Sequence, residues 1–308
     1  HLQNFTGAGR LFTPPAPADS LRRPPANLSR ARDHGLSGPR YEEENPKEWE
    51  AGKRSVSVPF YGFQHVDLVT GHGDECGGDY ARWLRAQRPD AEKLRDHRNQ
   101  LPHNYTCPQA IRTALPEELY PTAFIRDRAV DYLRGASKAD PFFLMVSFPD
   151  PHHPFTAPGK YWDMYKPEDM PVPAAYTRKD WKPSPFVQRL TEARESGKSK
   201  GEGQAAFAVS QKETLEARAL TLGMIAFIDD AIGEVLKALD ASGRREDTVL
   251  IFMSDHGDYL GDHRIMLKGA SLYQSIVRTP FLWSDPKSSV KGVHSDALAS
   301  TIDVPARS

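Results

Sequence analysis

The sequence has little cysteine, no long apolar run and no excess of charge of either sign. Only two of its 308 residues are cysteines, Cys76 and Cys107, so at most one disulfide can form and a disulfide-stabilised scaffold is excluded. No run approaches the ~20 apolar residues of a transmembrane helix, so no membrane span is expected. The formal net charge is −1, from 40 basic and 41 acidic residues, and it gives no reason to expect a nucleic-acid partner.

The apolar residues that are present follow the periods of strands and helices in alternation. This alternation predicts an α/β fold, in which helices cover a sheet. The expected core covers residues 60–155 and 214–285, and loop-rich insertions rich in Pro and charged residues cover 8–60 and 157–205. The elements expected in the core are strands at 61–69, 142–148, 248–253 and 277–283, and helices at 79–87, 122–133 and 214–239.

The most informative motif follows the apolar run 248–253. It reads Ser-Asp-His-Gly over 254–257, and Gly-Asp-His and Leu-Lys-Gly follow over 261–263 and 267–269. Ligands of open α/β sheets bind at the carboxyl ends of strands, and an adjacent carboxylate and imidazole suit a divalent metal. An N-cap aspartate beside a surface histidine is the plainer alternative, but the density of polar groups favours a metal site at Asp255 and His256.

A second apolar run, 142–148, also ends in histidine. Pro149-Asp150-Pro151 follows it and leads into His152 and His153. Two histidines beside prolines could form only a rigid turn. An imidazole has a pKa near neutrality, however, so the same position suits proton transfer in a reaction.

These motifs resemble those of the type I, formylglycine-dependent sulfatases of the alkaline-phosphatase superfamily. The resemblance implies that Asp255 and His256 bind a divalent cation, with Ca²⁺ ahead of Mn²⁺ or Mg²⁺. It implies that Lys268 contacts the sulfate and assists the leaving group. It also implies that His152 binds sulfate or protonates the leaving group.

Three more histidines take weaker assignments from the resemblance. His153 is a neighbour of the site, and His263 either supports it or contacts substrate. His1-Leu2 fits the last two positions of the family motif Gly-Lys-x-His-Leu. His1 would then be the catalytic histidine that deprotonates the covalent intermediate, although a match of two residues also arises by chance.

The nucleophile that the resemblance requires is not found in this chain. The family oxidises the Cys of Cys-x-Pro-x-Arg to formylglycine, whereas Cys107 is followed directly by Pro108 and only five positions later by Arg112. Cys107 and Cys76 are therefore expected to be structural thiols. The expectation is a partial sulfatase catalytic domain over 1–308, truncated at both ends, with the formylglycine upstream and no activity by itself.

The fold implied by the resemblance is an alkaline-phosphatase-like sandwich, a large mixed β-sheet flanked by helices. The implied function is hydrolysis of a small-molecule sulfate ester. The alternatives are a phosphonate monoester or phosphodiester hydrolase of the same superfamily, or a non-catalytic, metal-binding remnant of the fold. A homo-oligomer is compatible with the sequence, which distinguishes neither the alcohol part of the substrate nor a cytoplasmic, periplasmic or secreted location.

Overall fold

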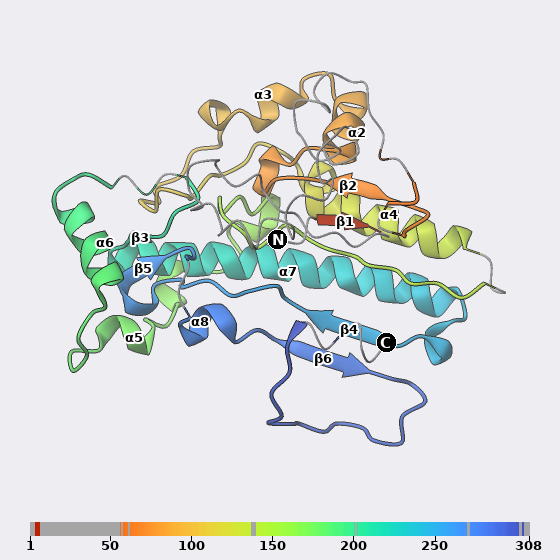
Figure 1. The fold of residues 1–308 in the computed structure, drawn as a ribbon. Coiled ribbons are helices and arrows are strands. Elements are labelled where there is room, and N and C mark those ends of the chain that lie inside the picture. The colour runs from red at the N-terminus through yellow and green to blue at the C-terminus, as the bar shows by residue number, and fades with distance from the viewer. Residues whose placement is uncertain are drawn as a thin grey trace, which may run out of the picture.

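A computed structural model describes residues 4–6, 56, 58–60, 62–136, 140–199, 201, 203–269, 272–301 and 304 (Figure 1). His1 and nearly all of the insertion 8–60 lie outside the described residues. The α-helices are α2 (Asp79–Gln87), α3 (Ala91–Arg95), α4 (Pro121–Gly135), α5 (Ala174–Thr177), α6 (Pro185–Glu195), α7 (Gln211–Ala241) and α8 (Gln274–Val277). The strands are β1 (Asn4–Thr6), β2 (Asp67–Val69), β3 (Phe207–Ala208), β4 (Leu250–Met253), β5 (Ile265–Met266) and β6 (Phe281–Ser284).

The long helix α7 crosses the whole molecule, with α2, α3 and α4 on one side and β4 and β6 on the other (Figure 1). Its start is fixed by a capping box, because the Ser210 hydroxyl accepts from Glu213 N at 3.2 Å and the Glu213 carboxylate accepts from Ser210 N at 2.7 Å. Its end is followed by Gly243 with φ +71°. The helix predicted over 214–239 is confirmed, as are those over 79–87 and 122–133.

The strands pair as three separate antiparallel ladders, β1 with β2, β3 with β5 and β4 with β6. The α/β class is confirmed, but the described residues do not show one large mixed sheet. Strand β4 is also half buried rather than buried, since the Phe252 side chain is 44% exposed. An apolar run indicates that a strand forms, whereas its partners come from distant parts of the chain and cannot be read from the run itself.

Two further expectations need correction. The run 142–148 is extended and half-buried chain with a single bridge residue, Val146, rather than a buried strand, and Phe143 is 67% exposed. The insertion 157–205 is not only loop, because it contains α5 and α6. Helix α6 starts at a sequence signal that the composition of the segment obscured, Ser184 followed by Pro185, with the Ser184 hydroxyl accepting from Val187 N at 3.4 Å.

Two buried clusters hold the segments that carry the polar motifs. One joins α7 to the chain around Phe155 and to Leu267, which is 0% exposed. The other packs α2 and α4 around Val69 and Cys76 at the two ends of the loop 70–76. Each polar motif is therefore next to core residues in the sequence. Among the described residues, no helix combines the length and the apolar character that crossing a membrane requires.

Candidate active site

The chain brings four predicted site residues together: Asp255, His256, Lys268 and His152. The loop after β4 folds back on itself, with Tyr259 N donating to Leu267 O at 2.9 Å and Gly261 N donating to Ile265 O at 3.0 Å. This return places Lys268, thirteen positions after Asp255, close enough for the Asp255 charge to act on the pKa of Lys268. The charge of Lys268 acts in turn on the pKa of His152.

The Asp255–His256 pair has the donor arrangement of two metal ligands. His256 Nδ1 donates to Gly257 O at 2.8 Å, and Nε2, the other ring nitrogen, lies 3.5 Å from Asp255 Oδ2. A ring fixed in this way by a backbone carbonyl is the usual form of a ligating histidine. The described residues contain no group of three or more His, Cys, Asp or Glu side chains that could hold a metal, so this pair alone would supply only part of such a site.

Gly257 is required for a reason that the sequence did not reveal. Gly257 is not among the glycines with positive φ, so its backbone conformation alone does not require glycine. A Cβ there would overlap with the carbonyl oxygen of Ser275, and Gly257 N donates to Ile276 O at 2.7 Å. The glycine therefore lets the chain before α8 approach the backbone beside His256.

His152 stacks between two other histidines. Its ring centroid lies 3.5 Å from that of His72 and 4.1 Å from that of His153. His152 Nδ1 donates to His153 O at 2.6 Å. His153 is 1% exposed, whereas His152 and His72 are half-buried. The imidazoles thus form one stack beside Lys268.

The imidazoles of this stack are held uncharged at neutral pH. Burial is the main cause in each case, and it lowers the pKa of His72 to about 4, of His152 to about 2 and of His153 to about 3. The Lys268 ammonium lowers all three pKa values further. Burial also lowers the pKa of Lys268, against the opposing charges of Asp258 and Asp255.

The sequence reasoning missed His72. Its segment, Thr70-Gly71-His72-Gly73, comes directly after β2, so it carries the signal that identified the other two motifs, polar residues at the end of an apolar run. Arg95 holds the loop by donating to Asp74 O and to Cys76 O, both at 2.8 Å. His97 Nε2 lies 3.0 Å from Asp74 Oδ1, and that carboxylate raises the pKa of His97.

The other predicted residues lie elsewhere or outside the described part. His263 packs against the rings of Trp181 and Tyr273, with centroid distances of 4.7 and 4.4 Å. Its support role stays a prediction, and so does the role of His1, whose position is not described. Cys76 and Cys107 are free, buried thiols. Burial raises the pKa of Cys107 to about 12 and that of Cys76 well above its usual value, as expected of structural thiols.

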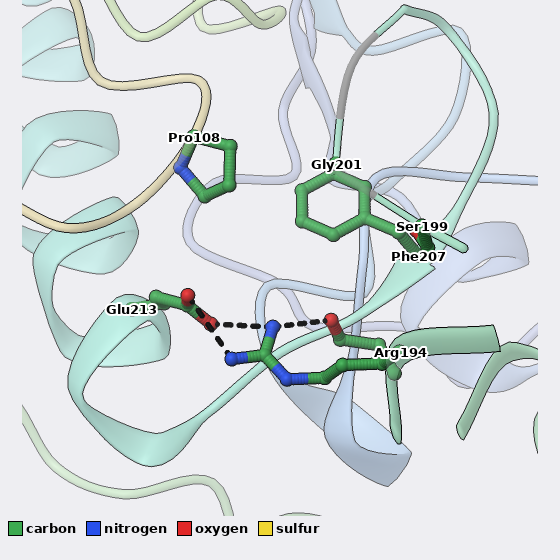
Figure 2. Close-up of a pocket in the computed structure, with 7 residues that line it drawn as sticks. Pro108, Arg194, Ser199, Gly201, Phe207 and Glu213 are labelled. Carbon is green, nitrogen blue, oxygen red and sulfur yellow. Dashed lines mark hydrogen bonds and ion pairs between the residues drawn. The ribbon is translucent and has the colours of Figure 1, made fainter. Parts of the chain in front are cut away.

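A cavity of about 310 Å³ lies apart from these residues, between the 194–201 segment and the start of α7 (Figure 2). Its one cation, Arg194, is already paired. Its guanidinium donates to Ala208 O at 2.9 Å and lies 2.9 Å from the Glu213 carboxylate. None of the predicted site residues lines this cavity, and its paired guanidinium is not available to an anionic ester.

The buried carboxyl group of Asp150, just before the histidine pair, predicts a pH dependence of stability. Burial is the main cause that raises its pKa to about 7. Between pH ~4, where an unfolded aspartate titrates, and ~7, the native chain binds a proton that the unfolded chain has lost, so this contribution to stability falls as pH rises. We expect the free energy of unfolding of Asp150→Asn, relative to that of the parent, to rise by on the order of 3 kcal/mol between pH ~4 and ~8.

The measurement is urea unfolding of the two proteins across this pH range. The stacked histidines, whose pKa values are lowered, give the opposite slope, since they lose their protons in the native state first. They are common to both proteins and cancel in the difference. A difference that stays constant with pH would contradict a raised pKa at Asp150.

Comparison with known proteins identifies the family to which this arrangement belongs. Residues 75–307 match the family model described as Sulfatase. The chain belongs to the sulfatase family. An arylsulfatase of Clostridium perfringens is 33% identical over 221 residues, which are 71% of this chain and 42% of the relative. The multifunctional alkaline phosphatase superfamily protein PehA of Trinickia caryophylli is 36% identical over 157 residues, 50% of this chain and 30% of the relative.

A solved structure supports the same superfamily. The phosphonate monoester hydrolase of Agrobacterium radiobacter superposes with a TM-score of 0.52 and 25% identity, over 67% of this chain and 41% of that one. The alkaline-phosphatase-like fold implied by the sequence is therefore confirmed. This sulfatase-family chain spans less than half the length of the curated relatives named here.

Proposed function

We propose that the protein containing this chain hydrolyses sulfate esters of small molecules. The observation that carries the proposal is the convergence of Asp255, His256, Lys268 and His152 in a chain whose residues 75–307 match the sulfatase family. These side chains offer a partial metal site, a cation for an anionic ester and an imidazole beside it. Their roles follow from the charge and hydrogen bonding of each group.

Lys268 suits the leaving-group role better than His152. Its ammonium is half-buried, and burial lowers its pKa from the ordinary value of 10.5, which makes it a stronger acid. The His152 ring is neutral and already donates through Nδ1 to His153 O, so Nε2 is an acceptor and not a proton donor. Lys268 would therefore neutralise charge on the departing alcohol oxygen, while His152 helps to orient the ester.

Asp255 and His256 fit two positions of a divalent metal site, in which Ca²⁺ is favoured by the family resemblance and Mn²⁺ or Mg²⁺ are alternatives. Such a metal supplies Lewis-acid polarisation of the ester oxygens. The family's formylglycine, proposed to lie outside this chain, supplies the nucleophilic oxygen. The residues of this chain would bind and orient the ester and move the proton at the leaving oxygen.

A phosphonate monoester or phosphodiester hydrolase is the second candidate. The superposition with the Agrobacterium radiobacter phosphonate monoester hydrolase favours it, as does the similarity to PehA. Sulfate esters and singly charged phosphorus esters share size and geometry, so the residues described here suit both. We retain sulfate hydrolysis as the better proposal because the family match and the arylsulfatase similarity both point to it.

The test uses the protein expressed at its full coding length. We expect its kcat/KM for 4-nitrophenyl sulfate to exceed that for bis(4-nitrophenyl) phosphate and for a phenylphosphonate monoester. The reverse order would replace the proposal with the second candidate. No turnover of any of the three esters would remove the hydrolase proposal and favour the non-catalytic remnant of the fold.

Metal binding has its own prediction. We expect Asp255→Asn to weaken binding of the divalent metal at least about tenfold, because it removes an anionic ligand. Metal content after dialysis, measured by mass spectrometry, gives the result without an activity assay. The matched control is Asp296→Asn, since Asp296 is 99% exposed and lies 3.8 Å from His294, an aspartate–histidine pair on the surface. Equal metal content in the two variants would rule out Asp255 as a ligand.

A further inference from the structure

His72 stacks on a residue of the candidate site although no motif led to it. Its ring lies 3.5 Å from His152, with an angle of 12° between the two ring planes. The charges of Lys268, Asp255 and His256 all act on it. It therefore contacts His152 and lies within the electrostatic range of the other groups to which the proposed function assigns a role, and it comes from a third segment of the chain.

The loop around His72 is built to hold one ring in one place. Gly71 and Gly73 flank it with φ of +77° and +56°, a conformation that glycine adopts without strain. A Cβ on Gly73 would lie 2.8 Å from Thr156 Oγ1 and 3.3 Å from Pro154, so the loop presses against the chain that follows His153. Arg95 fixes the far side through the carbonyls of residues 74 and 76.

A purely structural role does not account for the ring nitrogens of His72. Nδ1 is buried and has no hydrogen-bond partner among the residues that the structure describes. An atom closed off in this way cannot contact a bound ester, so the nitrogen that the ring offers to the site is Nε2, which is not buried in the same way. The stack on His152 explains the plane of the ring, but a phenyl ring would stack as well, so it does not explain a histidine.

The surroundings favour an oxygen of an anionic ester as the partner of the ring rather than a metal ion. The Lys268 ammonium makes the surroundings of the ring less favourable for a second cation and more favourable for an anion. A neutral imidazole offers one donor and one acceptor nitrogen. The ring can therefore donate to an ester oxygen without a change of its own charge.

We propose that His72 is a further substrate-contacting residue of this site, whose Nε2 donates a hydrogen bond to an oxygen of the sulfate ester bound beside His152 and Lys268. The inference rests on the proposed function for the identity of the ester. It assigns the loop 70–76 to the substrate-binding surface. His153, buried behind His152, is left with a supporting position.

The test separates the nitrogens of the ring from its stacking. His72→Phe keeps an aromatic ring on His152 and removes both nitrogens, whereas His72→Gln restores a donor. In the full-length protein we expect kcat/KM for 4-nitrophenyl sulfate to fall about 10- to 100-fold in His72→Phe and less in His72→Gln. The control is His65→Phe, because His65 precedes the same strand, is 52% exposed and pairs with Asp67 at 2.8 Å. Thermal unfolding checks that each variant folds, and His72→Gln carries the test alone if His72→Phe does not fold.

A His72→Phe variant whose kcat/KM stays within about twofold of the parent, as single surface changes do, would overturn the proposal and leave His72 a stacking role. A second readout, calorimetric titration with inorganic sulfate, needs no turnover. We expect weaker sulfate binding in His72→Phe than in the parent and in His65→Phe. If the parent hydrolyses none of the esters, the proposed function fails and this titration alone decides, with equal affinities overturning the role of His72.

Discussion

Replacing Lys268 with methionine should lower kcat/KM for 4-nitrophenyl sulfate by about 10²- to 10³-fold, the loss typical of removing one group that stabilises charge in a transition state. Lys268 is half-buried beside three imidazoles that burial keeps neutral, so no imidazole of the stack can replace its charge. Methionine fills similar space without charge. Steady-state kinetics of the full-length protein measure the effect.

The control for this variant is Lys160→Met. The Lys160 side chain is 60% exposed, and its ammonium lies 3.9 Å from the carboxylate of Asp230. A surface pair of this kind contributes little, so its loss should leave kcat/KM unchanged within about twofold. Lys268→Arg, which keeps the charge on a larger group, should recover part of the activity. A Lys268→Met variant within tenfold of the parent would exclude the role proposed for this lysine.

Replacing Glu216 with alanine should have the largest effect on stability, about 3–5 kcal/mol lost from the free energy of unfolding. Glu216 is 2% exposed on α7, and its carboxylate accepts from Thr106 N and Cys107 N, both at 2.8 Å. Alanine would leave these two backbone donors without their acceptor. Because Cys107 belongs to the buried cluster around α7, water cannot replace the carboxylate without disturbing that cluster.

Urea unfolding of the parent and the variant measures this loss. Glu234→Ala is the matched control, since Glu234 lies on the same helix, is 52% exposed and pairs with Lys237 at 2.7 Å. Its removal should leave the free energy of unfolding nearly unchanged, because an exposed ion pair contributes little. The loss of free energy of unfolding in Glu216→Ala should exceed that in Glu234→Ala by more than about 1 kcal/mol. A smaller excess would show that the two backbone donors find other partners.

The helices could be predicted from the sequence because their signals are local. The 3.6-residue spacing of apolar side chains places α2 at its observed bounds and α7 within three residues of them, with the capping box at Ser210 in the sequence itself. The sheet could not be predicted in the same way. Whether 142–148 becomes a paired strand depends on a partner elsewhere in the chain, and its apolar residues alone do not name that partner.

The candidate site was predicted where residue order matches a family pattern and missed where it does not. Asp255, His256 and Lys268 lie on one loop, so their spacing in the sequence was enough to predict them as site residues. His72 lies eighty positions before His152 in the sequence and stacks on it in the structure. A contact between residues so far apart cannot be inferred from their spacing. The sequence also could not show that burial lowers the pKa of His152, which favours the first of its two predicted tasks, binding sulfate, over protonating the leaving group.

The way in which Arg95 holds the loop 70–76 bears on how this surface can diverge between relatives. Both of its hydrogen bonds reach main-chain carbonyls, so they do not depend on which side chains stand at positions 74 and 76. Glu75, exposed between them, has one distant ion pair, 3.8 Å from His97 Nε2, which a surface position can lose at little cost. A lineage could therefore change the outward residues of this loop, and with them the groups that the proposed substrate site would accept, while Arg95 keeps the path of the backbone constant.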